Sequence, residues 1–246
     1  MGRIEKINEI VAEYCAEIIR EPLIFFSEAD LQALLYKHLI TTNHFGKYFD
    51  TKYQKGYGSK SVYKTTLVHR EYGINNMPNS RVDLAVFDKD EVKKINHPNL
   101  TYYKEDDKKD EYLTPLAAFE LGTEKTHDFS GHITNDLEKL KELVGQGMQR
   151  GYYIHFFRDK TVSAADTARR ELTEERIERE FRNVVKDIKP VENINVLLFL
   201  IRIYRKNQEK IWGKCEVFNV EEQKWEKVNI DQYKEELENK ILQILK

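Results

Sequence analysis

Three acidic residues occupy positions where a carboxylate needs a partner. Glu120 lies within the apolar stretch AAFELG, Asp83 within RVDLAVFD, and Glu28 at the start of EADLQALL. An ionised carboxylate among apolar neighbours is unfavourable unless it is paired or coordinates an ion. Three carboxylates together suit a hard divalent cation, Mg²⁺ or Mn²⁺, which polarises phosphoryl groups and generates a hydroxide nucleophile near neutral pH. These residues therefore indicate a candidate metal site for phosphoryl chemistry.

The elements that carry these acids must bring them together. Side chains two apart share a strand face, so Asp83 and Glu120 each lie on the face that their bulkiest apolar neighbours avoid. If the two strands pair, the two acids converge. Glu28 shares one stripe of its predicted helix with the leucines that follow it, so it faces the core, whereas Asp30 points away.

Each acid also has an ordinary explanation. Glu28 can favour a helix N-terminus through the helix dipole, and Asp83 can pair with Arg70 or Arg81 in a surface hairpin. Glu120 is harder to explain in this way because its flanks are the most apolar of the three. The set is therefore more persuasive than any single member.

The surrounding pattern is typical of one α/β domain over residues 1–246. Apolar spacing predicts helices over 3–20, 27–40, 131–149 and 231–246, and a long charged helix over 163–188. Alternating or continuous apolar runs predict strands over 65–73, 81–88, 114–122, 151–157, 193–205, 210–220 and 224–228. Residues 43–60 are predicted to be irregular, 74–80 to form a turn longer than a tight one, and 89–112 to be a solvated insertion. Ser27 and Asp30 predict a capping box at the start of the second helix.

The composition limits the classes of protein to consider. Apolar residues make up 40% of the 246 residues and charged residues 33%, which is typical of a globular protein with a charged surface. With 40 basic and 42 acidic residues there is no overall basic field, so any contact with nucleic acid must come from a local patch. Two cysteines make no disulfide framework, and the N-terminus lacks the apolar region of a signal peptide. No apolar run is long enough to span a bilayer, so we expect a cytoplasmic protein without membrane contact.

The order of these elements resembles a known family. A helix with Glu28, a hairpin with Asp83, a strand with Glu120, a helix containing DLEKL and a further strand are similar to the PD-(D/E)XK, or restriction-endonuclease-like, nucleases. The matching stretches are SEADLQALLYKHL, REYGINNMPNSRVDLAVFD, AAFELGTEK and NDLEKLKEL, in a core of about residues 27–157 that the C-terminal strands and helix extend. The resemblance implies a mixed central β-sheet flanked by α-helices and Mg²⁺-dependent phosphodiester hydrolysis. Asp83 and Glu120 would match the metal-binding acids, and Glu28 the helical acid.

One position departs from the family pattern. The pattern E-x-K places a lysine two residues after the strand glutamate, and this position is Gly122. That lysine is expected to orient the attacking water and to stabilise charge in the transition state. Lys125 is our first choice to reach back into the site, because Gly122 lets the backbone bend; Lys139 on the next helix is another candidate. Alternatively the site is inactive.

Other motifs are weaker. His132 and Asp136 are four apart at a helix start, where a surface pair is the simpler interpretation, and His69 is expected to be structural. GYGSKS lacks the spacing of a phosphate-binding loop. The arginines within 163–188 fit a solvated helix better than a phosphate contact, and the tyrosines between residues 48 and 63 could stack on bases or pack the irregular segment.

Two hypotheses follow. The first is a metal-dependent nuclease, expected to act on DNA, in restriction or defence, with Glu28, Asp83 and Glu120 holding Mg²⁺ or Mn²⁺ and Lys125 as the catalytic lysine; the sequence does not decide between DNA and RNA. A duplex cutter of this kind is expected to be a homodimer, since two strands need two sites. The second is a catalytically inactive nuclease-like module that binds nucleic acid or a partner protein, such as another component of a defence system.

Overall fold

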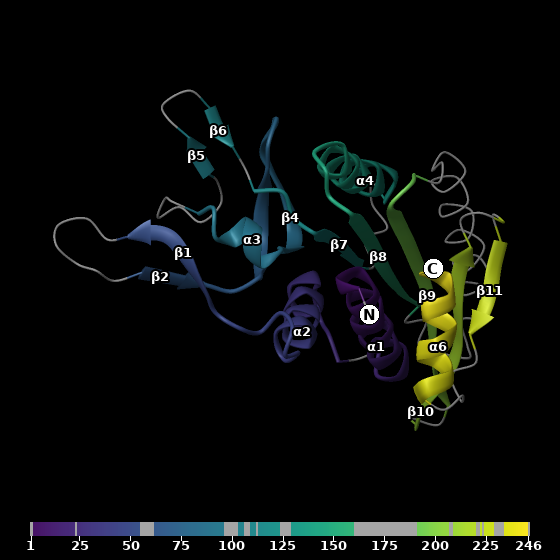
Figure 1. Ribbon diagram of the computed structural model, residues 1–246. Coiled ribbons are helices and arrows are strands. Elements are labelled where there is room, and N and C mark those ends of the chain that lie inside the picture. Colours follow the sequence, from purple (N-terminus) through teal and green to yellow (C-terminus); the bar gives the residue numbers. More distant parts are fainter. Residues whose placement is uncertain are drawn as a thin grey trace.

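The structure is a computed structural model of the chain, shown in Figure 1. It describes residues 2–22, 24–54, 62–95, 103–105, 109–111, 113–123, 129–159, 191–206, 209–219, 222, 224–228 and 234–245. The predicted charged helix over 163–188 lies outside these residues, as does Lys125.

A seven-stranded mixed sheet with the order β11-β10-β9-β8-β7-β4-β3 forms the centre of the fold. Its strands are β3 (Val68–Ile74), β4 (Met77–Val86), β7 (Ala117–Thr123), β8 (Arg150–Asp159), β9 (Ile194–Lys206), β10 (Glu209–Asn219) and β11 (Lys224–Val228). The three central strands β7, β8 and β9 run parallel, and the outer pairs are antiparallel. The mixed α/β class predicted from the sequence is therefore confirmed, and so is the hairpin of β10 and β11.

Helices cover both faces of this sheet, as Figure 1 shows for α1 and α4. The helices are α1 (Arg3–Arg20), α2 (Glu28–Ile40), the short α3 (Lys89–Val92), α4 (Phe129–Gly145) and α6 (Lys234–Ile244). Helix α1 lies on one face, where Tyr152 on β8 donates a 2.6 Å hydrogen bond to Asn8 and Phe156 contacts Tyr14 edge to face. Helix α4 lies on the opposite face, with Leu140 beside the backbone of β8.

The start of α2 follows the predicted capping box. The Ser27 hydroxyl accepts a hydrogen bond from the Asp30 N–H, and the Asp30 carboxylate accepts one from the Ser27 N–H. These bonds satisfy backbone donors that a helix N-terminus otherwise leaves free. The leucines of the predicted stripe, Leu31, Leu35 and Leu39, are buried. The helix therefore begins where the sequence predicted and turns the predicted face inward.

Three local predictions were wrong in detail. The segment predicted as irregular contains β1 (Phe49–Gln54), which pairs with β2 (Val62–Thr65) in a small separate sheet. The segment 74–80, predicted to be a longer turn, contains a two-residue turn that closes the β3–β4 hairpin. Only Asn75 and Asn76 form this turn, and Asn76 adopts a positive φ of 66°. The predicted solvated insertion carries α3 and the short strands β5 (Tyr103–Glu105) and β6 (Lys109–Glu111).

The central strand β9 confirms the prediction of a strand covered on both faces. Its residues Leu197–Ile201 are all buried, with Phe199 stacked on Phe156 of β8. Helix α6 packs close to α1 in Figure 1, and Asn195 of β9 donates a hydrogen bond to the carbonyl of Leu245 at its end. Among the described residues, no helix has the length and apolar character that crossing a membrane requires.

Candidate active site

Asp83 and Glu120 lie next to each other on neighbouring strands. Strands β4 and β7 are antiparallel and their paired residues end at Leu84 and Phe119, so Asp83 and Glu120 follow directly beyond the last pair, and the Leu121 N–H donates a hydrogen bond to Asp83. Residues directly opposite each other point to the same face of a sheet. Both carboxylates are withdrawn from solvent, since Asp83 is 9% exposed and Glu120 only 2%. The structure therefore brings together the two acids that the strand pattern predicted to converge.

The backbone of β7 and a side chain of α2 hold the Asp83 carboxylate. Its Oδ2 accepts a 2.6 Å hydrogen bond from the Leu121 N–H, and its Oδ1 accepts a 2.8 Å bond from Gln32 Nε2. Gln32 Oε1 in turn accepts a 2.8 Å bond from Arg70. Asp83 is therefore linked to Arg70 by two hydrogen bonds through Gln32, and not by the direct ion pair considered from the sequence. Burial raises the pKa of Asp83 to about 7; the Leu121 N–H opposes this rise, and the negative charge of Glu28 adds to it.

Glu120 is paired with a lysine from the helix above it. Lys139 Nζ of α4 lies 3.0 Å from Glu120 Oε1 and 2.8 Å from Asp136 Oδ1. The contact with Glu120 is an ion pair without the angle of a well-directed hydrogen bond, because Oε1 has no hydrogen-bond partner among the described residues. Burial raises the pKa of Glu120 well above its usual range, and the charges of Asp83 and Asp136 raise it further. One lysine therefore faces several acids in a poorly solvated place.

Glu28 and Asp136 complete a cluster of acids around Tyr153. Tyr153 lies opposite Glu120 on β8 and is buried. Its pKa is raised first by burial and then by the negative charges of Asp136, Glu120, Glu28 and Asp83. Four acids from α2, β4, β7 and α4 thus act on a single hydroxyl, and we call them the acid cluster. Glu28, predicted to face the core, is partly exposed.

Gly122 lies against the ring of His155. The two residues are opposite each other on β7 and β8. A Cβ at Gly122 would come within 2.1 Å of His155 Nδ1, closer than any real contact. His155 Nδ1 also lies 3.2 Å from the Tyr153 hydroxyl, and both side chains are buried. The position of the missing E-x-K lysine is therefore filled from the neighbouring strand, by a histidine ring.

The chemistry of the acid cluster suits a hard cation, but the present spacing of its carboxylates does not. Carboxylate oxygens are the ligands that Mg²⁺ and Mn²⁺ prefer, and buried Glu120 Oε1 has no directed hydrogen bond from the described residues. Within the same part of the chain, no three His, Cys, Asp or Glu side chains are close enough to enclose one ion as they stand. Binding of a cation would therefore require the carboxylates of the acid cluster to move closer together than they are in this structure.

Some site residues were not predicted as such from the sequence. Tyr153 and His155 carried no motif, although their alternation within GYYIHFF places both on one face of a strand next to Glu120. Asp136 was expected to form a surface pair with His132; His132 is exposed, as expected, but Asp136 belongs to the acid cluster. His69 has a structural role, as predicted, because it bonds the Thr66 carbonyl.

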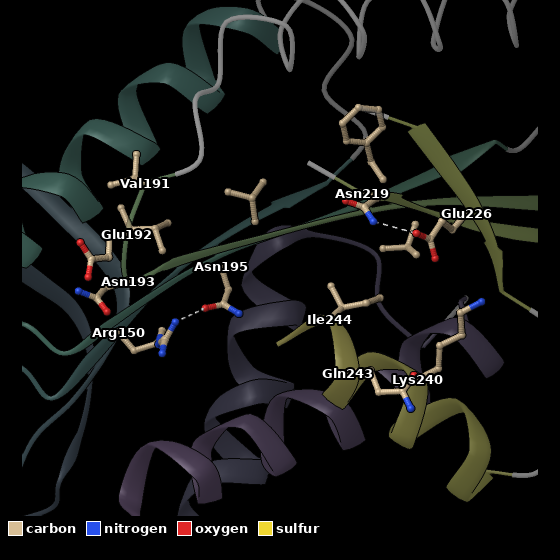
Figure 2. Close-up of a pocket in the computed structure, with 14 residues that line it drawn as sticks. Arg150, Val191, Glu192, Asn193, Asn195, Asn219, Glu226, Lys240, Gln243 and Ile244 are labelled. Carbon is tan, nitrogen blue, oxygen red and sulfur yellow. Dashed lines mark hydrogen bonds between the residues drawn. The ribbon is translucent and has the colours of Figure 1, made fainter. Parts of the chain in front are cut away.

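A cavity lies beside helix α6 (Figure 2). This cavity of about 530 Å³ is lined by the ends of β8, β9 and β10, by Glu226 of β11 and by α6. Its polar groups bond largely within the protein: Arg150 donates to Asn195, and Asn219 donates to Glu226, as the dashed lines in Figure 2 mark. The functional proposal therefore depends on the acid cluster and not on this cavity.

Comparisons with known proteins give no relative from which a role could be transferred. The chain matches no family model, no curated protein and no solved structure.

Proposed function

We propose that this chain is a metal-dependent nuclease of restriction-endonuclease-like architecture that hydrolyses phosphodiester bonds of DNA. The observation that carries this proposal is that Asp83 and Glu120, on neighbouring strands, are both buried, while the negative charge of the partly exposed Glu28 on a third element acts on Asp83. Burying carboxylates that repel one another costs stability, and such groups are concentrated at functional sites. The mixed sheet with helices on both faces agrees with the architecture that the resemblance implies.

Glu28, Asp83 and Glu120 would be the ligands of Mg²⁺ or Mn²⁺. When bound, such an ion polarises the phosphate and lowers the pKa of a coordinated water. The chain itself supplies the ligands, keeps Asp83 oriented through the Leu121 N–H, and limits access of bulk water by burying Glu120. A bound cation also lowers the pKa of the acids that hold it, so cation binding and deprotonation are coupled.

Lys139 is the residue we assign to the role of the absent E-x-K lysine. Its ammonium contacts Glu120 from α4, while Gly122 has no room for a side chain and Lys125 lies outside the described residues. A cation placed there can stabilise the charge that develops on the phosphate oxygens. Tyr153 and His155 lie behind the acids and would position them.

A catalytically inactive module is the second candidate. The observation that favours it is that Lys139 already neutralises Glu120, the most buried acid of the cluster. If this ion pair persists in the presence of divalent cations, the chain would bind nucleic acid or a partner protein without cutting.

Cleavage assays separate the two candidates. The purified chain would be incubated with supercoiled, linear and single-stranded DNA and with RNA, in Mg²⁺, in Mn²⁺ and in EDTA. We expect metal-dependent cutting of DNA that is lost in Glu120→Gln and Asp83→Asn and kept in Glu138→Gln, which alters an exposed acid on α4. Salt-sensitive binding with no cutting in either metal would establish the inactive module instead. Cutting that survives both acid variants would refute the assigned site.

A further inference from the structure

Phe26 presents its ring to solvent beside the acid cluster. It lies in the turn between α1 and α2 and is 88% exposed, two residues before Glu28. Single exposed apolar side chains are common on protein surfaces, so exposure alone carries little weight. The way in which this turn is fixed, and its place next to the site, distinguish Phe26.

A buried arginine from the central sheet holds one end of the turn. Arg158 on β8 donates hydrogen bonds of 2.8 Å to the Pro22 carbonyl and 2.6 Å to the Phe25 carbonyl. Its guanidinium also lies 3.7 Å from the centroid of the Phe25 ring. Phe25 is completely buried, and it contacts Phe156 of the core. The residue before Phe26 is therefore anchored inward.

The capping box of α2 holds the other end. Asp30 Oδ2 accepts 2.9 Å hydrogen bonds from the N–H groups of both Phe26 and Ser27. The backbone on each side of Phe26 is thus bonded to the protein, and the ring points outward from a fixed position. A ring presented in this way loses little conformational freedom on binding, which favours its use as a contact.

The turn leads directly into Glu28 of the acid cluster. Two residues of extended chain span at most about 7 Å, so the Phe26 backbone lies within that distance of the Glu28 backbone. Glu28 is partly exposed, whereas Asp83 and Glu120 are buried. A phosphate that approaches Glu28 from solvent would therefore come within reach of a base stacked on Phe26.

We propose that Phe26 stacks on an unpaired nucleobase next to the phosphate that is cut, so that the preferred substrate is single-stranded or locally unpaired DNA. This inference rests on the proposed nuclease function and deepens it. Aromatic rings stack on every base with little sequence preference, and a stacked base must first leave a duplex. The ring selects strand state and not sequence.

The test measures stacking separately from cleavage. Oligonucleotides with 2-aminopurine at successive positions, single-stranded or in a blunt duplex, would be titrated with the full chain in Ca²⁺. We expect quenching of 2-aminopurine in the single strand, and dissociation constants that rise roughly 5- to 100-fold in Phe26→Ala. Phe26→Trp should bind as the parent does, and Phe26→Leu, similar in apolar character but without a ring, should resemble the alanine variant. Because Phe26 is exposed, these substitutions leave the packed core intact.

Ile24 provides the matched control, since it is 43% exposed in the same turn and carries no ring. Ile24→Ala should leave quenching and affinity unchanged. Equal losses in Phe26→Ala and Ile24→Ala, full binding by Phe26→Leu, or a preference for the blunt duplex would each overturn the inference. If the parent cuts DNA and Phe26→Ala binds normally, the stacking role alone fails. If quenching depends on Phe26 but no DNA is cut in Mg²⁺ or Mn²⁺, the nuclease function alone fails.

Discussion

The ring of His155 occupies the space in which a side chain at Gly122 would lie, with Nδ1 2.1 Å from the position of a Cβ. The two residues face each other on the parallel strands β7 and β8, so neither can move away without disturbing the central sheet. A lysine two residues after Glu120 is excluded by this packing, while Lys139 reaches the same carboxylate from α4. The space that a side chain at position 122 would need is therefore taken by a residue of the neighbouring strand.

Substitution of Gly122 by alanine should destabilise the protein by about 1–3 kcal/mol, because the added methyl group collides with a buried ring. The free energy of unfolding would be measured in urea. Gly145→Ala is the matched control, since a Cβ there meets nothing within 4 Å. The double variant Gly122→Ala/His155→Ala should lose less stability than the two single losses added together. Equal effects of Gly122→Ala and Gly145→Ala would contradict the packing described.

Without divalent cations, stability should fall as the pH rises through neutrality. The folded protein releases the Asp83 proton near pH 7, whereas an unfolded chain releases it near about 3.9. Between these values the folded state binds more protons, so the free energy of unfolding contributed by Asp83 decreases with pH and has been lost above the folded pKa. Asp83→Asn removes this dependence. The difference in free energy of unfolding between Asp83→Asn and the parent should therefore shift in favour of the variant by roughly 1–3 kcal/mol from pH 5 to pH 8.

The measurement is urea unfolding in EDTA at several pH values. Asp90→Asn serves as the control, because Asp90 is exposed and its pKa is lowered by Lys93. If Asp83→Asn and Asp90→Asn change the pH profile equally, the buried position of Asp83 has no energetic effect.

Mg²⁺ or Mn²⁺ should raise the melting temperature, and more at pH 8 than at pH 6, because the carboxylates must be deprotonated to bind a cation. At a cation concentration ten times the dissociation constant, the added stability is about 1.4 kcal/mol. Glu120→Gln should abolish the shift and Glu138→Gln should keep it. A shift that is equal in both variants would place the cation elsewhere.

Replacing Lys139 by methionine should reduce cleavage roughly 10²- to 10³-fold, which is typical for the loss of one charge-stabilising donor. The control is Lys141→Met, which removes an exposed lysine paired with Glu138 on the same helix. Initial rates of plasmid cutting at saturating Mn²⁺ would be compared. An unchanged rate in Lys139→Met, with Lys141→Met equally active, would exclude Lys139 from the reaction.

The sequence predicted the elements of the core and the pairing of Asp83 with Glu120, because period-two alternation fixes which side chains share a strand face. It also predicted the start of α2, because a capping box is a local signal. It named Lys139 only as a second candidate after Lys125 and did not predict His155 as the neighbour of Gly122. Those contacts depend on how α4 and β8 pack on β7, which no local pattern encodes. The two-residue turn was missed because strand β4 already begins at Met77, within the segment 74–80 that was predicted to be one longer turn.

The hydrogen bond from Tyr152 to Asn8 joins residues 144 positions apart. Helix α1 is therefore synthesised long before the strand that buries its apolar face, and its buried residues, such as Ile10 and Val11, must wait for β8. Contacts of such long range slow folding and leave apolar surface uncovered on the growing chain. A nascent chain that ends before β8 would expose the apolar face of α1, to which chaperones can bind. The protein should therefore depend on chaperones during synthesis more than the stability of the folded protein suggests.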